Sequence, residues 1–285
     1  MKVFDQFDLT DYNSYRIKST CSRAYMPQNN EDIVTLFHSA RTSRPIVIGG
    51  GYNIILSKDY YQDDFVIFSD NMSEFRLEDD NIIAQPGVSL LTLSTFALEH
   101  ALTGMEIFYD IPSSLGGAVV MNAGASGEEI KDILRQVTYF DPLDDQFHTI
   151  TREDLTFEYR NSFFQKNPHL IIVEAVLGLK PGVACKIHEK METIKAARWA
   201  KQPKDLPNAG SVFKRPPGRF VGPMIDELGL KGFSIGGAKI SEKHGGFIVN
   251  FDHASGTDIL EIIRIVKEKV MDKFGVNLEI EQRIL

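Results

Sequence analysis

Two glycine-dense segments constrain this chain more than any other feature of its sequence. Gly49-Gly50-Gly51-Tyr52-Asn53 directly follows the short apolar run Pro45-Ile46-Val47-Ile48, which predicts a buried strand that ends in a tight turn. Three consecutive residues without Cβ atoms let backbone N–H groups converge on an anion without steric obstruction. Taken alone, the segment suits a purely structural turn equally well.

The second segment, Pro112 to Gly127, consists mainly of small and apolar residues. We expect a loop whose backbone packs tightly against another part of the chain. Two backbone-exposing loops in one domain suit a long ligand with a pyrophosphate near its middle. The pair therefore favours a binding site over two unrelated structural turns.

Several familiar kinds of binding site are excluded. The first glycine segment does not satisfy G-x-G-x-x-G, because Ile54 stands where the last glycine is required, and no G-x-x-x-x-G-K-[ST] sequence occurs. With 31 Lys and Arg against 39 Asp and Glu, the net charge of −8 argues against a nucleic-acid carrier. Cys21 and Cys185 are the only cysteines and lack metal-ligand spacing, so no disulfide framework or metal centre is predicted.

The remaining pattern predicts an α+β chain of two parts. Short strands alternate with few helices, and the composition shifts at Lys180-Pro181-Gly182, which indicates a boundary near residue 180. Apolar residues at helical spacing predict helices from Asn30 to about Ala40, from Ser89 to Leu102, and before Gly275. No apolar stretch approaches the ~20 residues that span a bilayer. Since the acidic start also lacks the features of a signal peptide, we expect a cytoplasmic protein.

Three polar clusters lie outside the glycine segments. Ser211 stands between a glycine and two cations, Arg160 lies in Tyr159-Arg160-Asn161-Ser162, and Glu281 lies near the C-terminus. Each has a plain alternative, because Ser211 would also cap a turn, Arg160 would pair with a surface acid, and Glu281 would be an exposed charge. The basic stretch from Lys186 to Arg219 is either a solvated helix face or a local field for an anionic small molecule.

Together these segments resemble the UDP-N-acetylenolpyruvoylglucosamine reductases, the flavoenzymes that complete UDP-N-acetylmuramate for bacterial peptidoglycan. The resemblance covers nearly the whole chain and rests on six motifs in the family's order, namely Val47 to Asn53, Ile111 to Gly127, Tyr159 to Ser162, Ala209 to Pro216, Gly229 to Asn250 and Phe274 to Glu281. It implies an FAD-binding domain of the vanillyl-alcohol oxidase (PCMH) type over residues 1–180, in two α+β subdomains split near residue 60. A smaller α+β substrate-binding domain over residues 181–285 is implied to follow.

The resemblance also implies roles for individual residues. Arg160 matches the group that lies against the substrate carboxylate, Glu281 the acid at the same carboxyl group, and Ser211 the proton donor. The residues implied to hold FAD without a covalent bond are Gly49, Gly50, Gly51, Tyr52, Asn53, Pro112, Ser113, Gly116, Gly117, Asn122, Ala123, Gly124 and Gly127. Those implied to bind the substrate are Lys201, Lys214, Arg215, Lys243 and His244, although His244 also suits a structural role.

The chain departs from the family pattern at three of these motifs. Tyr52 stands where serine is usual, Ser126 where tyrosine is usual, and Arg215 where asparagine is frequent. The tyrosine would move one flavin phosphate contact from a hydroxyl to the backbone. None of the three departures affects Arg160, Ser211 or Glu281.

The implied reaction takes hydride from NADPH onto FAD and then passes it to the enolpyruvyl ether of a UDP-sugar. Negative charge develops beside the substrate carboxylate during the second hydride transfer, and a guanidinium such as that of Arg160 suits this charge. Two carboxylates in contact would repel each other, so Glu281 is expected to be protonated when this charge forms. The implied partners are NADPH and the UDP-sugar. We expect the protein to be a monomer. Two alternatives stay open, a flavin-dependent oxidase on the same FAD scaffold and a catalytically silent sugar-nucleotide or flavin-binding protein.

Overall fold

The computed structural model describes residues 1–39 and 44–285. The chain folds into two units, each built from segments that are far apart in the sequence. The first unit contains residues 1–5, 23–50 and 63–196, and the second contains residues 6–22, 51–62 and 197–285. The chain passes between the units at five points. One lies between Gly50 and Gly51, and the other four lie within β1 (Lys2–Asp8), β2 (Thr20–Met26), β5 (Tyr60–Ile67) and α5 (Ala184–Lys201).

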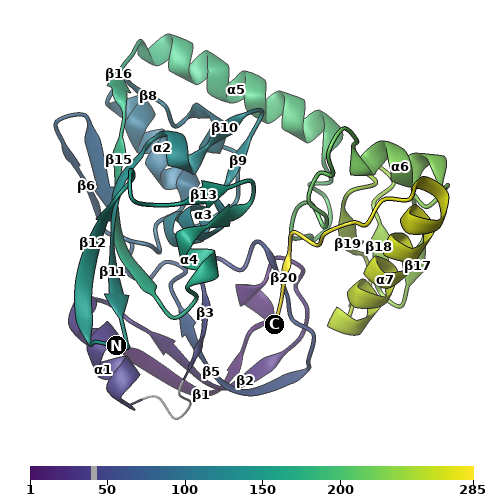
Figure 1. Cartoon of the computed structure of the whole chain (residues 1–285), viewed down its shortest axis with the longest axis horizontal. Helices are drawn as coiled ribbons and strands as arrows, with labels where there is room; N and C mark the ends of the chain where they lie inside the picture. The colour runs from purple at the N-terminus through teal and green to yellow at the C-terminus, as the bar shows by residue number, and fades with distance from the viewer. Residues whose placement is uncertain (40–43) are drawn as a thin grey trace. The chain divides into compact units, whose positions relative to one another are not determined.

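A five-stranded antiparallel sheet in the order β12-β11-β15-β7-β6 forms the centre of the first unit (Figure 1). Its strands are β6 (Phe75–Glu78), β7 (Asn81–Ala84), β11 (Leu134–Asp141), β12 (Gln146–Thr151) and β15 (Ile171–Gly178). Val137 stands opposite Ala175, and Ala175 stands opposite Ala84. All three belong to one buried core, because residues in register on neighbouring strands point to the same face of a sheet.

Helices cover both faces of this sheet. On one face, α2 (Leu90–Glu99) buries Leu90, Leu93 and Ala97, and its N-cap Ser89 accepts a hydrogen bond from Thr92 N at 2.9 Å. On the other face, α1 (Asn30–Ser39) contributes buried apolar side chains to a second core that includes residues of β11 and β15. Burial from both sides explains why β15 is almost continuously apolar.

Short elements complete the first unit. Strand β3 (Ile46–Ile48) runs parallel to β5 at the edge of the sheet β1-β2-β5-β3. The other pairs are β8 (Leu102–Thr103) with β16 (Lys180–Pro181), β9 (Gly124–Ala125) with β10 (Glu128–Glu129), and β13 (Phe157–Glu158) with β14 (Asn161–Ser162). The short helices are α3 (Leu115–Met121), α4 (Phe163–Lys166), and two 3-10 turns at Glu106–Phe108 and Ile130–Asp132.

The second unit combines a small antiparallel sheet with two helices (Figure 1). The sheet runs in the order β17-β18-β19, and the elements are β17 (Ser234–Ile235), β18 (Ala238–Ile240), β19 (Ile248–Asn250), α6 (Val221–Glu227), α7 (Gly256–Phe274) and a 3-10 turn at Thr10–Tyr12. Ser255 and Asp258 form a capping box at the start of α7, and Gly275 ends it with φ of 64°. Strand β20 (Arg283–Ile284) pairs in parallel with β4 (Ile54–Ile55), which fixes the last residues of the chain.

The predicted α+β class is confirmed, as are the helices that begin near Asn30 and Ser89 and the helix capped by Gly275. The predicted end of the second helix at Leu102 is wrong, because α2 ends at Glu99 and Leu102 lies in β8. The predicted end of the first helix at Ala40 lies outside the described residues. The boundary near residue 180 stays a prediction. Among the residues that the structure describes, no helix has the length and apolar composition needed to cross a membrane.

A second expectation is wrong. Pro112 to Gly127 is not a continuous loop, because it contains the helix α3 and β9, the first strand of the hairpin β9–β10. Ser114 accepts a hydrogen bond from Gly117 N at the start of α3, and the helix buries Leu115 and Val119 in the core. Burial of these apolar side chains outweighs the low helix propensity of two adjacent glycines.

Candidate active site

The two glycine segments meet inside the first unit. A Cβ atom at Gly49 would lie 2.2 Å from Ser114 Oγ and 3.9 Å from Gly117 N, so any other residue there would displace the capping serine. Gly116 is also tight, because its Cβ atom would lie 2.8 Å from Pro86 Cβ. The expected tight packing of the second segment is therefore confirmed.

The hydrogen-bond donors of the two segments are used differently. At the start of α3, Leu115 N donates to Val88 O at 2.8 Å and Gly116 N donates to Pro86 O at 2.9 Å. Across the described ranges 1–39 and 44–285, by contrast, the N–H groups of Gly49 to Gly51 donate no hydrogen bond to another residue. Adjacent N–H groups without internal partners, on a backbone that lacks Cβ atoms, fit a phosphate group.

The first glycine segment continues into the second unit. Gly51 has φ of 68°, and a Cβ atom there would lie 2.0 Å from Tyr12 O. Tyr52 is exposed, and Asn53 Nδ2 donates to Glu281 O at 3.2 Å. Asn53 therefore connects this segment to the C-terminal segment that carries Glu281.

The residues predicted from the second segment lie at both ends of α3. Pro112 is exposed, and Ser113 Oγ donates to Ser114 O at 2.9 Å. Asn122 follows the last residue of α3 with φ of 47°, and Ala123 N then donates back into the helix. This arrangement turns the chain directly from α3 into β9.

The hairpin β9–β10 ends the second segment. Gly124 begins it, and a Cβ atom at this position would lie 2.1 Å from Glu128 O. Ser126 and Gly127 form the two-residue tip with φ of 56° and 92°, the positive values that tight hairpin turns require. The serine found in place of the family's tyrosine therefore occupies an exposed turn.

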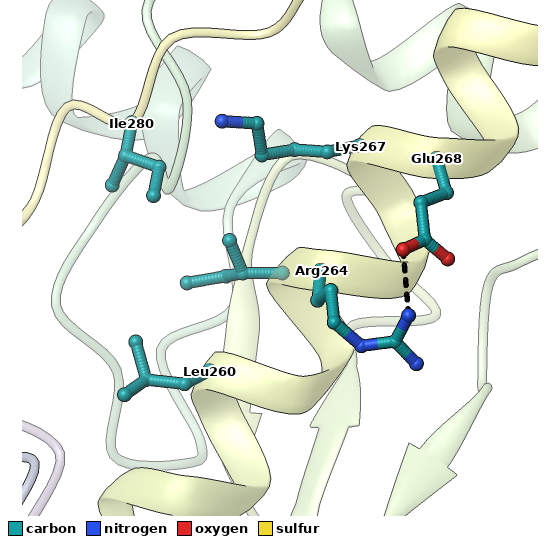
Figure 2. A pocket seen from close by; sticks show the side chains of 6 residues that line it. Leu260, Arg264, Lys267, Glu268 and Ile280 are labelled. Carbon is teal, nitrogen blue, oxygen red and sulfur yellow. Dashed lines mark hydrogen bonds and ion pairs between the residues drawn. The ribbon is translucent and has the colours of Figure 1, made fainter.

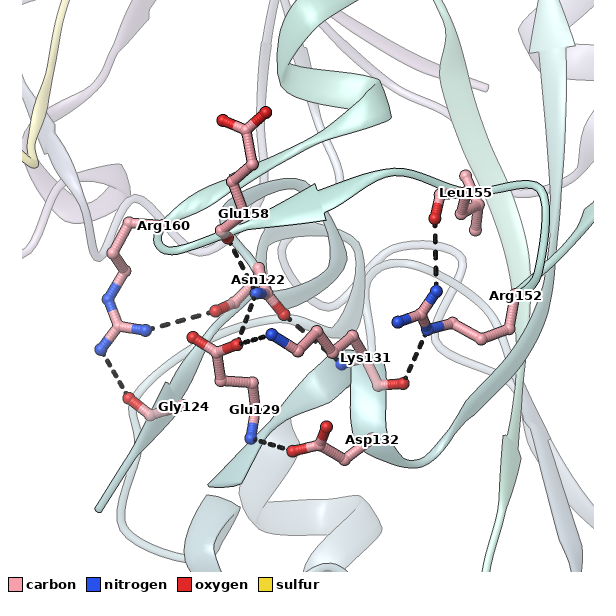
Figure 3. Close-up of polar contacts among 9 residues, drawn as sticks. All are labelled: Asn122, Gly124, Glu129, Lys131, Asp132, Arg152, Leu155, Glu158 and Arg160. Carbon is pink, nitrogen blue, oxygen red and sulfur yellow. Dashed lines mark hydrogen bonds and ion pairs between the residues drawn. The ribbon is translucent and has the colours of Figure 1, made fainter. Parts of the chain in front are cut away.

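Arg160 lies at the tip of the β13–β14 hairpin. Its backbone has φ of 54°, which is uncommon for a residue with a Cβ atom. Its Nη2 donates to Gly124 O at 2.6 Å and its Nη1 to Asn122 O at 3.3 Å (Figure 3), while the guanidinium carbon lies 5.1 Å from the Tyr159 ring centroid. These contacts hold the guanidinium beside the second glycine segment.

Ser211 and Glu281 lie on adjacent segments of the second unit. Val212 N donates to Gly246 O at 3.0 Å, and Glu281 N donates to Val212 O at 2.8 Å. Ser211 is exposed, and within the described part of the chain its hydroxyl forms no hydrogen bond. The hydroxyl therefore caps no turn or helix among these residues, which leaves it available to a ligand.

A buried amide that the sequence reasoning missed holds these two segments together. Gln282 Nε2 donates to Ala209 O at 3.0 Å and to Gly210 O at 3.2 Å, and Gln282 Oε1 accepts from Tyr15 Oη at 3.0 Å. Complete burial raises the pKa of Tyr15, so its hydroxyl stays protonated and remains a donor. Nothing in the sequence marks Gln282, because its partners are far from it along the chain.

The cations predicted to bind the substrate have varied surroundings. Lys214 forms an ion pair with Glu279, and Lys243 Nζ donates to Trp199 O at 2.7 Å. The Arg215 guanidinium carbon lies 3.8 Å from the centroid of the exposed Phe220 ring, and Lys201 is exposed. Their substrate contacts stay predictions.

His244 is held by its own loop. Its Nδ1 accepts a hydrogen bond from Gly246 N at 3.0 Å, and its ring packs edge-on against Phe247 with 4.9 Å between centroids. Burial, with a smaller effect of Lys231, lowers the pKa of His244. A neutral ring with Nδ1 as acceptor carries its proton on Nε2, and this arrangement favours the structural role.

The lowered pKa predicts how acid affects stability. Below the ordinary histidine pKa of about 6.5, the unfolded chain binds a proton at His244 that the folded chain does not. The free energy of unfolding therefore decreases as the pH is lowered. In His244→Asn, the amide oxygen still accepts the Gly246 bond but does not titrate. Denaturant unfolding at pH values above and below 6.5 should therefore show the difference between wild type and variant shrinking on acidification. A constant difference would contradict the assigned protonation.

A shallow hollow of about 380 Å³ lies on α7 in the second unit (Figure 2). It is lined by Leu260, Ile263, Arg264, Lys267, Glu268 and Ile280. Arg264 pairs with Glu268 at its edge, at 2.6 Å. None of the predicted site residues lines this hollow, although Ile280 directly precedes Glu281.

One group of side chains has the proximity of metal ligands. Asp141, Asp144 and His148 lie near the β11–β12 turn with ligand atoms within 4.8 Å of one another. Asp141 Oδ1 accepts from Leu143 N at 2.9 Å, and Asp144 Oδ1 accepts from Gln146 N at 3.1 Å, as in ordinary Asx turns. The turn geometry accounts for the closeness of these three side chains. The absence of a metal centre stays a prediction.

Comparison with known proteins decides the family. Residues 22–149 match the model of an FAD binding domain, and residues 202–285 match that of the UDP-N-acetylenolpyruvoylglucosamine reductase C-terminal domain. The UDP-N-acetylenolpyruvoylglucosamine reductase of Syntrophomonas wolfei is 38% identical over 97% of this chain and 93% of its own length. That of Latilactobacillus sakei is 42% identical over 91% of this chain and 86% of its own length. The chain belongs to the UDP-N-acetylenolpyruvoylglucosamine reductase family.

The fold agrees with this reductase family. The crystal structure of the Thermus caldophilus reductase superposes with a TM-score of 0.83 at 31% identity, covering 99% of this chain and 98% of that one. The predicted family and the predicted FAD-binding domain are confirmed, and a C-terminal domain of this family follows that domain. Both glycine segments lie within the FAD-binding match, and Ser211 and Glu281 lie within the C-terminal match, whereas Arg160 lies between the two.

Proposed function

We propose that this chain reduces UDP-N-acetylglucosamine enolpyruvate to UDP-N-acetylmuramate, with NADPH as reductant, in peptidoglycan precursor synthesis. Its membership in the reductase family supports the reaction. One observation within the molecule carries the proposal. Gly49 packs against Ser114 and Gly117, and the N–H groups of Gly49 to Gly51 donate no hydrogen bond to any described residue. A long cofactor with a central pyrophosphate is the ligand that such a pair of segments suits.

The residues present fit FAD. The N–H groups of Gly49 to Gly51 would bind the pyrophosphate, and the glycines that line both segments let the ligand approach the backbone. FAD, when bound, accepts hydride from NADPH and donates it to the substrate. The predicted FAD contacts of Tyr52, Ser113 and their neighbours belong to this proposal. Asn122 is left out of it, because its side chain has no exposed surface.

Three side chains are proposed to act on the substrate. Arg160 binds the carboxylate, because a guanidinium stays ionised and donates two parallel hydrogen bonds to a planar anion. Glu281 lies at the same carboxyl group in its protonated form, since a second negative charge there would oppose binding. Ser211 donates the proton that neutralises the carbanion carbon, and its exposed hydroxyl has no internal partner among the described residues to compete with the substrate.

The remaining assignments are part of the same proposal. Lys201, Lys214, Arg215 and Lys243 bind the anionic UDP-sugar, and the local excess of cations supports this in an acidic protein. A cytoplasmic location is also part of the proposal. A monomeric state is proposed as well, and sedimentation of the purified holoenzyme tests it.

Flavin content tests the proposed cofactor site. Gly50→Val places a branched side chain where the phosphate must approach the backbone, so we expect the purified variant to carry much less FAD than the wild type. Flavin absorbance relative to protein absorbance measures the occupancy, and an unfolding midpoint close to that of the wild-type protein stripped of FAD verifies that the variant is folded. Full flavin content together with wild-type reduction by NADPH would show that this turn does not hold the cofactor.

A further inference from the structure

We propose that Asn122 is a positioning residue whose side chain fixes the turn that carries Arg160. The inference rests on the proposed role of Arg160 at the substrate carboxylate. Asn122 ends α3 in the left-handed region, with φ of 47° and ψ of 55°, and has no exposed surface. A residue this deeply buried at such a turn acts through the groups that it contacts inside the protein.

Every polar atom of the Asn122 side chain is used (Figure 3). Its Nδ2 donates to Glu158 O at 3.0 Å and to Glu129 Oε2 at 2.9 Å, and its Oδ1 accepts from Lys131 N at 3.4 Å. An amide group has two donor hydrogens and one acceptor oxygen, so these three bonds define which way the amide points. The side chain itself has no donor left for a bound ligand.

The contact with Glu158 sets the position of Arg160. Glu158 is the last residue of β13 and pairs with Asn161, so only Tyr159 and Arg160 lie between the strands. From the tip, the Arg160 guanidinium reaches back to the backbone oxygens of Asn122 and Gly124. The hairpin is thus attached to the same segment at two points, once by the Asn122 side chain and once by Arg160 itself.

Charged neighbours hold the amide in place. Glu129 forms an ion pair with Lys131 and has only 15% of its side chain exposed, and Glu129 N donates to Asp132 Oδ2 at 2.8 Å. The carboxylate is therefore fixed where it accepts from Asn122 Nδ2, and a charged acceptor strengthens that bond. Asn122 links this fixed charge to the Arg160 turn.

Loss of the side chain should move the guanidinium without removing it. The Glu158 carbonyl would lose the Asn122 bond while Arg160 keeps its charge and its two backbone acceptors. A displacement of about 1 Å at a substrate-positioning group lowers a rate by as much as ~10²-fold. The reaction with NADPH does not involve the substrate carboxylate, so it should be unchanged.

Two substitutions test the role. Asn122→Gly keeps the left-handed backbone and removes all three side-chain bonds, whereas Asn122→Asp keeps the shape but replaces the donor with a negative charge beside Glu129. In the holoenzyme we expect both variants to reoxidise with substrate ~10- to 10²-fold more slowly than wild type and to be reduced by NADPH at the wild-type rate. Their affinity for UDP-N-acetylmuramate, measured by calorimetry, should fall as well, because the product also carries the carboxylate.

A matched control and a double-mutant cycle complete the test. Asn167→Asp removes a similar amide-to-carbonyl bond in the same unit, from Nδ2 to Phe163 O at 2.9 Å, and should leave both half-reactions unchanged. Combined with Arg160→Lys, Asn122→Gly should add little further loss, since residues that act through one another are not additive. Fully additive losses, equal losses in both half-reactions, or wild-type reoxidation would overturn the inference. Failure of the proposed function gives a different result, because Arg160→Lys alone would then show no selective loss.

Discussion

Replacement of Ser211 with alanine should nearly abolish oxidation of the reduced flavin by the substrate, while NADPH still reduces the flavin at close to the wild-type rate. The alanine removes the proposed proton donor and leaves Arg160 in place. Loss of a positioned acid typically lowers a rate by ~10²–10⁴-fold. Stopped-flow measurement of the two half-reactions under anaerobic conditions separates the two effects.

The surroundings of Ser211 make this result diagnostic. Because its hydroxyl caps nothing within the described residues, the alanine variant should unfold at the wild-type midpoint, whereas loss of a cap would cost ~1 kcal/mol. Ser211→Cys should recover part of the rate, since a thiol also delivers a proton. Substrate-driven reoxidation of the alanine variant at the wild-type rate would remove Ser211 from the mechanism.

Arg160→Lys should impair the substrate half-reaction by about 10²-fold or more, the usual cost of losing a hydrogen-bond donor aimed at developing charge. A lysine keeps the positive charge but cannot form the forked pair of hydrogen bonds to a carboxylate. Reduction by NADPH should change little. The same stopped-flow experiment measures both rates.

The first unit contains a matched control for this arginine. Arg152 also donates to two backbone oxygens, Lys131 O at 3.0 Å and Leu155 O at 3.3 Å, and lies 5.1 Å from an aromatic ring centroid (Figure 3). Arg152→Lys should therefore affect stability but neither half-reaction. Equal losses in both half-reactions of Arg160→Lys, or the same losses in Arg152→Lys, would show that the effect of Arg160 is structural.

The sequence could predict what depends on local pattern. Leu90, Leu93 and Ala97 recur at helical spacing, and this periodicity survives in α2 because the same residues form the core. The glycine turn after Ile48 is also a local property, since it depends on missing Cβ atoms. Amphipathic helices and glycine turns can therefore be predicted from nearby residues alone.

The sequence could not predict what depends on contacts between distant residues. Tyr15 and Gln282 are 267 positions apart, and a buried glutamine has the same sequence signature as a surface one. Asn122 is similar, because its role depends on Glu158, which only the folded hairpin brings near. Glycines in Pro112 to Gly127 suggested a loop, and the burial of α3 against the sheet overrode that local tendency.

The most direct test of the proposed function follows the flavin absorbance of the wild-type holoenzyme without oxygen. Addition of NADPH should bleach the flavin bands, and subsequent addition of UDP-N-acetylglucosamine enolpyruvate should restore them with formation of an equal amount of UDP-N-acetylmuramate. A protein without absorbance in the flavin bands would contradict FAD binding. A flavin that NADPH reduces but that only oxygen reoxidises would identify an oxidase instead of the reductase.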